Sequence, residues 1–321
     1  MGGATKGATT RKSARKGGKG VRTKVKKSDY YNEYHGHTTR DLEVVADALP
    51  EVGPGPRRST FYLVGDSSFD NKYWLDVPSE PASNGLGEVV TPARSVPDVA
   101  HQLNEELVRR GLGERCCAIN AAVEESTLSD RFDGKLTPQD QVVRAKLRAE
   151  DVVCVSVGGN DIALRPTAWT ILSMVSLLAC PTALIEAGLA PGLGHFVRLF
   201  GARTKAFVES LTAETKPRLV VVTMLYFLAE HREGAPRSWA DRTLSLLGYN
   251  RNPRKLQLVI RKIFELATRQ IRIDGVERVV AVPFFESMDG KTEADYVQRV
   301  EPSAQGGRKM ARAILDAVEA H

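Results

Sequence analysis

Short apolar segments alternate with amphipathic segments from about residue 60 to the C terminus. Five of the apolar segments are rich in β-branched residues and have the length of buried strands. This alternation is typical of repeated βα units and predicts a mostly parallel sheet covered by helices. The predicted strands are residues 61–65, 116–120, 152–157, 219–225 and 278–282. The predicted helices, besides the one that follows residue 95, are residues 138–148, 193–214, 237–247, 253–272 and 305–320.

The clearest helix signal follows residue 95. Ser95-Val96-Pro97-Asp98 has the form of a capping box with proline in the first turn. Val99, Leu103 and Leu107 then recur every four residues until Gly111. We therefore expect a helix capped by Ser95 that turns these apolar residues toward the core.

The segments before residue 60 differ from the rest of the chain. Residues 1–27 contain ten Lys or Arg and no Asp or Glu, so the net charge of +6 belongs to this segment. The remainder has 35 basic and 39 acidic residues. We expect a disordered basic tail over residues 1–28, because it has many glycines and no apolar periodicity. Residues 29–59 are polar and contain prolines, which favours a loosely attached arm or linker.

The ordered domain is then expected over residues 60–321, with an apolar insertion near 166–200. This insertion forms either a cap or acyl-binding wall beside a site, or a helix packed between neighbours. The uncharged stretch 166–185 contains Pro181 and several hydroxyl residues, so we expect no transmembrane span.

The cysteines and the basic tail give indications of the cellular compartment of the protein. The cysteines stand in apolar runs without metal-binding spacing, so reduced thiols in an intracellular protein are expected. They are Cys116, Cys117, Cys154 and Cys180. A cytoplasmic or nuclear protein fits best, with an organelle as the alternative. The basic tail suits contact with nucleic acid or an anionic membrane, a targeting role, or simple solvation.

Two predicted strands end in small and polar residues. Gly65-Asp66-Ser67 follows the first, and Gly158-Gly159-Asn160-Asp161 follows the third. An open α/β sheet binds its ligand outside the carboxyl ends of its strands, so both segments are expected at one site. A serine hydroxyl and an asparagine amide there suit a nucleophile and an oxyanion donor. For the second segment alone, an ordinary turn is the alternative.

With these segments the sequence resembles the SGNH, or GDSL-type, hydrolase family from about residue 60 to the C terminus. The resemblance implies a three-layer, flavodoxin-like α/β/α fold with five parallel strands in the order 2-1-3-4-5. It also implies that Ser67 is the nucleophile and that Asn160 and the Ser67 backbone N–H hold the oxyanion. Gly65, Asp66, Gly159 and Asp161 would lie around this pocket.

Two further family motifs are altered. Residues 120–127 resemble the family's Asn-x-Gly-x-x-Gly-x-Thr, with Glu125 at the oxyanion glycine. Its N–H can still donate, but its carboxylate would oppose an oxyanion unless it points away. Glu301-Pro302-Ser303 with Gly306 resembles His-Pro-Ser-x-x-Gly, which implies that Glu301 replaces the histidine base. Gln298 then stands at the triad aspartate position, where an amide can hydrogen-bond to Glu301 rather than repel it.

A glutamate base changes the expected reactivity. Reference pKa values are about 4.3 for Glu and about 6.5 for His, so removing the serine proton is harder by roughly 3 kcal/mol. The rate penalty is about 10- to 100-fold, and burial that raises the glutamate pKa reduces it. His231 and His195 are alternative bases, and Asp295 is the nearest late aspartate to orient one. The alternative is that both histidines are exposed loop residues that do not act as a base.

These residues favour hydrolysis of a small-molecule ester, or acyl transfer, through an acyl-enzyme on Ser67 with Glu301 as general base. We expect no cofactor, and Asp66, Glu125, Asp161 and Glu301 lack the spacing of a metal site. The alternative is a catalytically silent protein that kept the fold and pocket for binding or scaffolding. The glutamates at 125 and 301 favour that alternative.

Overall fold

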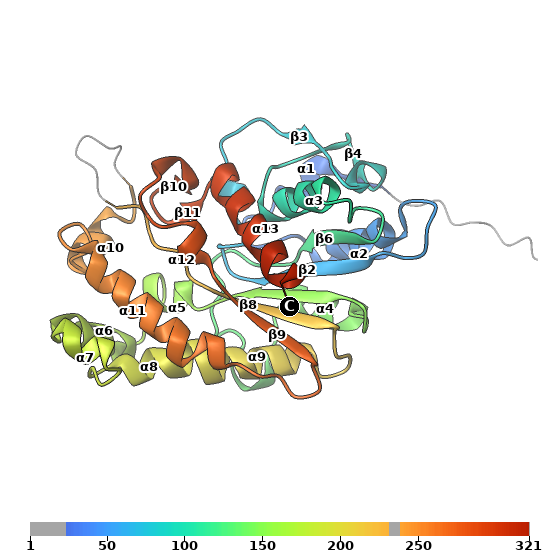
Figure 1. Cartoon of the computed structure of the whole chain (residues 1–321). Coiled ribbons are helices and arrows are strands. Elements are labelled where there is room, and N and C mark those ends of the chain that lie inside the picture. The colour runs from blue at the N-terminus through green and yellow to red at the C-terminus, as the bar shows by residue number, and fades with distance from the viewer. Residues whose placement is uncertain (1–23, 231–237, 321) are drawn as a thin grey trace, which may run out of the picture.

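A five-stranded parallel sheet forms the centre of the protein in a computed structural model that describes residues 24–230 and 238–320 (Figure 1). Its strand order is β6-β2-β7-β8-β9, which is the predicted order 2-1-3-4-5 along the chain. The fold class and topology are therefore confirmed. The strands are β2 (Ser59–Gly65), β6 (Cys116–Asn120), β7 (Val152–Ser156), β8 (Leu219–Met224) and β9 (Arg278–Pro283).

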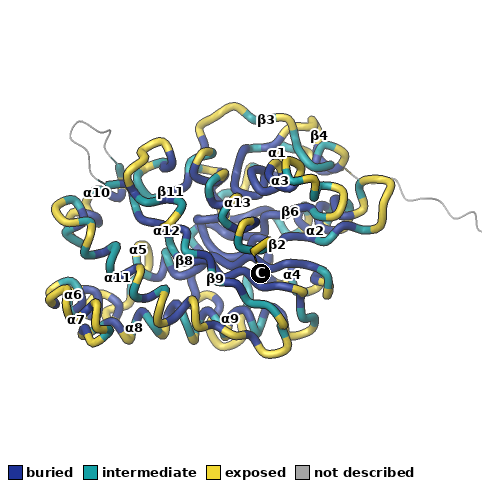
Figure 2. The backbone as a smooth tube through the Cα atoms, viewed as in Figure 1, coloured by how far each residue is buried: buried dark blue, intermediate teal, exposed yellow. Residues whose placement is uncertain are grey.

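Helices cover both faces of the sheet because successive strand residues point to opposite sides. Phe61 and Leu63 of β2 belong to the core under α3 and α13, whereas Tyr62 and Val64 belong to the core under α2, α4, α9 and α11. Figure 2 shows the buried strands between these two layers. The helices are α1 (Lys27–Tyr30), α2 (Thr39–Ala48), α3 (Val99–Arg109), α4 (Pro138–Lys146), α5 (Gly159–Ala163), α6 (Ala168–Ala179), α7 (Thr182–Glu186), α8 (Leu193–Arg198), α9 (Thr204–Leu211), α10 (Asp241–Leu246), α11 (Pro253–Leu266), α12 (Phe284–Ser287) and α13 (Ala304–Glu319).

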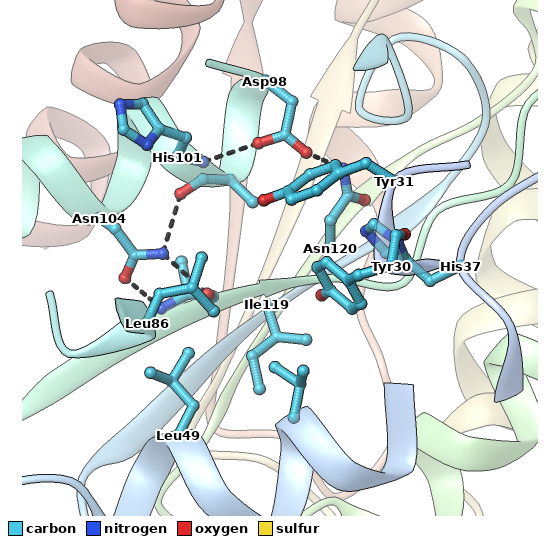
Figure 3. A pocket seen from close by; sticks show the side chains of 13 residues that line it. Tyr30, Tyr31, His37, Leu49, Leu86, Asp98, His101, Asn104, Ile119 and Asn120 are labelled. Carbon is cyan, nitrogen blue, oxygen red and sulfur yellow. Dashed lines mark hydrogen bonds between the residues drawn. The ribbon is translucent and has the colours of Figure 1, made fainter. Parts of the chain in front are cut away.

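The segment expected to be a loosely attached arm packs into the core. Leu42 and Val45 of α2 are buried, and Tyr30 stacks on His37 with ring centroids 3.7 Å apart. Figure 3 shows these two rings beside a small cavity of about 10 Å³, which is large enough for one water molecule. The sequence did not predict this packing, because α2 buries only three apolar residues, Leu42, Val45 and Ala46.

Part of the predicted basic tail is also ordered. Residues 1–23 lie outside the described residues, but β1 (Val25–Lys26) pairs with β4 (Val90–Thr91), and Val25 is buried. Two more short pairs occur, between β3 (Glu80–Pro81) and β5 (Arg94–Ser95) and between β10 (Tyr296–Val297) and β11 (Glu301–Pro302).

Two helix predictions need correction. The cap of α3 is Asp98, which accepts the His101 N–H at 2.8 Å, whereas Ser95 lies in β5 and bonds the His101 ring. Asp98 stands next to the first residue of α3, where its carboxylate is the better acceptor for the free N–H groups of the first turn.

The predicted helix 193–214 is divided, because the π-helical segment Leu199–Arg203 separates α8 from α9.

The four cysteines are free thiols, and only Cys116 is partly exposed. The uncharged stretch near residue 170 forms α6, which ends at Ala179. In the described ranges, no helix has both the length and the apolar character needed to cross a bilayer.

Candidate active site

Gly65 brings the end of β2 against β7. It has φ of +127°, and a Cβ atom there would lie 1.7 Å from the Ser156 carbonyl oxygen. Only glycine fits both this backbone angle and this close approach. The tight strand end directs the next residues, Asp66 and Ser67, out of the carboxyl edge of the sheet.

Ser67 stands in a single turn directly after β2. The N–H groups of Phe69 and Asp70 each donate to the Asp66 carbonyl at 3.1 Å, and Asp66 Oδ1 accepts the Ser68 N–H. The N–H of Ser67 itself donates to no other described residue. The turn therefore presents both the hydroxyl and the backbone N–H of Ser67 to a ligand.

Asn160 reaches the same place from β7. Gly158, with φ of +98°, precedes α5, and a Cβ atom there would meet the Phe200 ring at 2.6 Å. The Asn160 amide donates one hydrogen bond to the Ser126 carbonyl at 3.1 Å. Its second N–H has no acceptor among the described residues, and Asn160 and Ser67 line one cavity.

Glu125 has a backbone conformation that favours glycine, with φ of +60°. Its N–H donates to no described residue, like that of Ser67. Its carboxylate turns outward, where it contacts the Tyr34 hydroxyl and the His35 ring at 3.3 Å. Glu125 is not among the residues that line the cavity, and its carboxylate points away from it.

Glu301 lies on β11 and is only 5% exposed. Its pKa is raised to about 8, mainly by burial and then by the charge of Asp66, while the nearby Ser67 side chain opposes this increase. Its Oε2 atom has no hydrogen-bond partner in the described part of the chain. The structure thus brings Ser67, Asn160 and Glu301 together at one cavity.

Three more buried carboxyls surround this site. Burial raises the pKa of Asp66 to about 6 and that of Glu124 to about 9, the latter also through the charge of Glu301. Asp70 pairs with Lys72 at 2.5 Å and accepts the N–H groups of Gly36 and Glu124. Glu124 was not predicted as a site residue, because nothing in the spacing of residues 120–127 distinguishes its buried side chain from that of Glu125.

Arg131 was also missed. It forms a buried ion pair with Asp140 at 2.7 Å and donates to Ser126 Oγ and to the Gly65 carbonyl. Since Ser126 also accepts the Asn160 amide, Arg131 connects the strand end before Ser67 to the support of Asn160. We infer a positioning role for Arg131, which no short motif indicates.

Other predicted site residues point elsewhere. Gln298 is exposed, and its side chain accepts the Trp239 N–H rather than bonding Glu301, because the chain turns through φ of +50° at this residue. Asp295 is held by Lys309 at 2.6 Å and by Gln305. Asp161 supports the loop after Ser126 by accepting the Leu128 N–H. Gly159 and Asp66, by contrast, lie side by side and line the cavity as expected.

No histidine in residues 24–230 or 238–320 lines the cavity. His195 contacts Thr170 at 3.0 Å, and His231 lies outside the described residues. His101 bonds Ser95 and Glu80, but Ser95 is 0% exposed and this group opens onto no substrate-sized space. Nor do the described residues contain a group of His, Cys, Asp or Glu arranged to hold a metal.

The cavity beside Ser67 has a volume of about 610 Å³ and is mostly apolar. It extends from the polar residues at the sheet edge between α6, α8, α10 and α11. Ile171 and Val175 of α6 and Leu246 of α10 line it and are also exposed, so its walls continue to the protein surface. The apolar insertion is therefore a wall of the cavity rather than a helix packed on all sides. Trp169 and Leu172 do not line the cavity and are exposed, whereas Leu177 and Ile185 of the same insertion are buried in the core.

Comparison with known proteins gives matches in structure only. No family model and no curated protein matches this chain. Solved structures that resemble it include an acetyl xylan esterase from Geobacillus stearothermophilus, with 16% identity, a TM-score of 0.42 and coverage of 81% of this chain and 94% of that one. An extracellular lipase from Streptomyces rimosus has 14% identity, a TM-score of 0.42 and coverage of 81% and 99%. Phospholipase A1 from Streptomyces albidoflavus NA297 has 13% identity, a TM-score of 0.41 and coverage of 81% and 99%. The neighbours are thus esterases and lipases.

Proposed function

We propose that this protein hydrolyses carboxylic esters through an acyl-enzyme on Ser67, with Glu301 as the general base. One observation carries the proposal: Ser67 and the buried carboxyl of Glu301, whose pKa is raised, line the same large cavity. The resemblance to SGNH hydrolases in the order of the sequence motifs points the same way.

The raised pKa answers the main objection to a glutamate base. An ordinary glutamate has a pKa about 2 units below that of histidine, which makes it a poor acceptor for the serine proton. Burial raises the pKa of Glu301 to about 8. An ionised Glu301 is therefore at least as basic as an ordinary imidazole, and its nearness to Ser67 provides the proton acceptor that acyl transfer needs.

Two donors at the cavity fit the role of an oxyanion hole. They are the N–H group of Ser67 and the second N–H of the Asn160 amide, neither of which has an acceptor among the described residues. Donors held in place before the reaction stabilise a developing oxyanion without reorganisation. The outward turn of the Glu125 carboxylate removes the repulsion that the sequence alone suggested.

The proposed reaction has two halves. Ionised Glu301 takes the Ser67 hydroxyl proton while Ser67 Oγ attacks the ester carbonyl, and the resulting oxyanion binds to the Ser67 N–H and the Asn160 amide. The C–O bond to the alcohol then breaks, and Glu301 returns the proton to the leaving oxygen. A water molecule, deprotonated by Glu301, releases the acid by the reverse sequence, and acyl transfer results if an alcohol replaces that water.

The cavity suits an extended acyl chain. Its walls include Met174, Phe196, Leu256 and Ile260, and it opens at Ser67. Each buried methylene contributes about 0.8 kcal/mol, so a chain of eight or more carbons gains far more than an acetyl group. We therefore place medium or long acyl chains among the substrates.

A fluorophosphonate probe tests the nucleophile. Wild type should be labelled, Ser67→Ala should not, and Ser68→Ala should still be labelled because Ser68 is the adjacent hydroxyl in the same turn. Turnover of p-nitrophenyl decanoate should fall at least 100-fold in Ser67→Ala and in Glu301→Gln. Equal labelling of wild type and Ser67→Ala contradicts the proposal.

Binding of an apolar ligand without turnover is the second candidate function. The observation that favours it is the pKa of about 8 for Glu301, which leaves most molecules without an ionised base at pH 7. This candidate predicts tight binding of decanoate with no ester turnover at pH 7 or at pH 9. Turnover that appears at pH 9 and requires Ser67 excludes it.

A further inference from the structure

Helix α6 turns large apolar side chains to the protein surface and hydroxyl side chains inward. Its residues Thr170 and Ser173 are each 4% exposed. Four large apolar residues of the same helix are instead between 53% and 60% exposed: Trp169, Ile171, Leu172 and Val175. A helix at the surface of a soluble protein normally has the opposite arrangement, with polar residues in water. An exposed apolar face of this kind marks a site of interaction.

This part of the chain also carries very little charge. Glu186 is the only Asp, Glu, Lys or Arg in residues 166–197, and α6 itself has none. Both α6 and α7 lie at one end of the molecule, where Figure 2 shows much of their length as exposed. A surface without charged groups suits contact with an apolar phase better than a partner bound through ion pairs.

The apolar face continues into the cavity beside Ser67. Ile171 and Val175 are exposed and also line the cavity, and so does Leu246 of α10, which is 80% exposed. An acyl chain can therefore pass from this face to Ser67 along apolar side chains. A second copy of the protein on this face would cover the entrance, whereas a lipid phase would supply the chain through it.

The helices around the cavity are basic. Together α6, α8, α10 and α11 contain six Lys or Arg and two Asp or Glu, whereas residues 28–321 as a whole contain 35 and 39. Exposed residues of this basic group include Arg198, Arg242 and Arg254. Positive charge next to an apolar face favours a lipid surface with anionic headgroups.

Segments of this chain outside the described residues have the wrong composition to cover the face. Residues 231–237 contain no large apolar residue, and residues 1–23 contain only Met1 and Val21. Burial of the four exposed apolar residues of α6 requires an apolar surface, which neither segment supplies.

We propose that Trp169, Ile171, Leu172 and Val175 of α6 and Leu246 of α10, which we call the docking face, bind to the surface of an anionic lipid bilayer. Tryptophan suits such an interface because its ring combines an apolar body with a polar N–H. The ester then enters the cavity directly from the bilayer. This inference rests on the proposed ester hydrolysis for the use of the cavity, and it names membrane lipid as the source of the substrate.

Vesicle binding by full-length Ser67→Ala tests docking in the absence of turnover. The vesicles contain equal amounts of phosphatidylcholine and phosphatidylglycerol, at about 0.5 M salt, where attraction to the basic residues 1–27 is largely screened. We expect the protein to sediment with the vesicles. Trp169→Glu and Leu172→Glu, each added to Ser67→Ala, should weaken binding at least about tenfold, because a carboxylate is costly in contact with lipid.

The matched control is Val108→Glu. Val108 is 50% exposed on α3, which covers the opposite face of the sheet, so this variant should bind vesicles like Ser67→Ala alone. Folding of Trp169→Glu should be preserved, since Trp169 is exposed and an acidic residue in the first turn of a helix is favourable. Leu172→Glu provides a second variant on the same face.

Activity with the native serine provides an independent measurement. Trp169→Glu should lower the rate for a decanoate ester carried in the vesicles at least about tenfold. Its kcat/KM for soluble p-nitrophenyl butyrate should match that of wild type, because Trp169 does not line the cavity.

The outcomes separate docking from catalysis. Docking is overturned if Ser67→Ala does not bind vesicles, or if both glutamate variants of α6 bind as well as Val108→Glu. A dimer that Trp169→Glu dissociates, without vesicle binding, overturns it in favour of a second copy on this face. Vesicle binding without turnover of any ester supports docking but overturns the proposed hydrolysis.

Discussion

Ser67 and Glu301 line the same cavity, and the Glu301 side chain is almost fully buried there, with the residue 5% exposed. Their elements lie far apart in the sequence, since Ser67 follows β2 and Glu301 begins β11. Asn71 Nδ2 donates to the Pro302 carbonyl at 2.9 Å and joins these two segments directly. This hydrogen bond holds the segments that carry Ser67 and Glu301 side by side.

The pH dependence of activity should report the ionisation of Glu301. A general base acts only when deprotonated, and the pKa of Glu301 is raised to about 8. We expect kcat/KM for a neutral ester to increase with pH up to about 8 and then to level off. The measurement is a pH–rate profile from pH 5 to pH 10 with p-nitrophenyl decanoate, corrected for spontaneous hydrolysis.

Replacement of the base provides the control for that profile. Glu301→His introduces a base with a reference pKa of about 6.5, so the increase should move to lower pH if the variant is active. Glu301→Gln should abolish the pH-dependent increase. A wild-type profile that levels off below pH 6 argues against Glu301 as the base.

Glu124 should make stability decrease with pH. Its pKa is raised from 4.5 to about 9 in the folded protein, mainly by burial and then by the charge of Glu301. Between these values the unfolded chain has lost this proton and the folded protein has kept it, so the free energy of unfolding falls as pH rises. Each such group contributes a slope of up to about 1.4 kcal/mol per pH unit.

Glu124→Gln removes this contribution, so the variant should become more stable relative to wild type as pH increases from 5 to 9. Urea denaturation at five pH values measures the difference. Glu150→Gln, which replaces an exposed carboxylate, serves as the matched control. A parallel pH dependence of wild type and Glu124→Gln contradicts the buried, protonated state.

Gly65→Ala should disrupt the strand end that presents Ser67. The added Cβ would lie 1.7 Å from the Ser156 carbonyl oxygen, in a backbone conformation with φ of +127° that alanine avoids. We expect a loss of at least about 3 kcal/mol in the free energy of unfolding, or no folded protein at all. Gly55→Ala is the control, since its Cβ meets nothing within 4 Å. Equal thermal unfolding of the two variants contradicts this account.

The regular elements of the fold were predictable because their signals are local. Five β-rich segments gave the sheet, and Gly65 and Gly158 marked the strand ends that carry Ser67 and Asn160. Contacts between distant segments were not predictable in this way. The burial of Glu124 depends on Asp70 and Trp74, which lie about 50 residues earlier, and Arg131 acts through Asp140 and Gly65. Gln298 was misplaced because a motif position does not fix the direction of a side chain when the backbone has a positive φ.

The cavity walls should determine the preferred length of the acyl chain. Met174 of α6 is 7% exposed and lines the cavity, whereas Leu172 on the same helix is 54% exposed and does not. Met174→Trp should shorten the cavity, so that the ratio of kcat/KM for dodecanoate to that for butyrate falls at least about tenfold, equivalent to about two methylenes excluded from the apolar walls. Leu172→Trp introduces the same ring outside the cavity and should leave the ratio unchanged. If both variants keep the wild-type ratio, the acyl chain does not occupy this cavity, even though Ser67 and Glu301 lie at its wall.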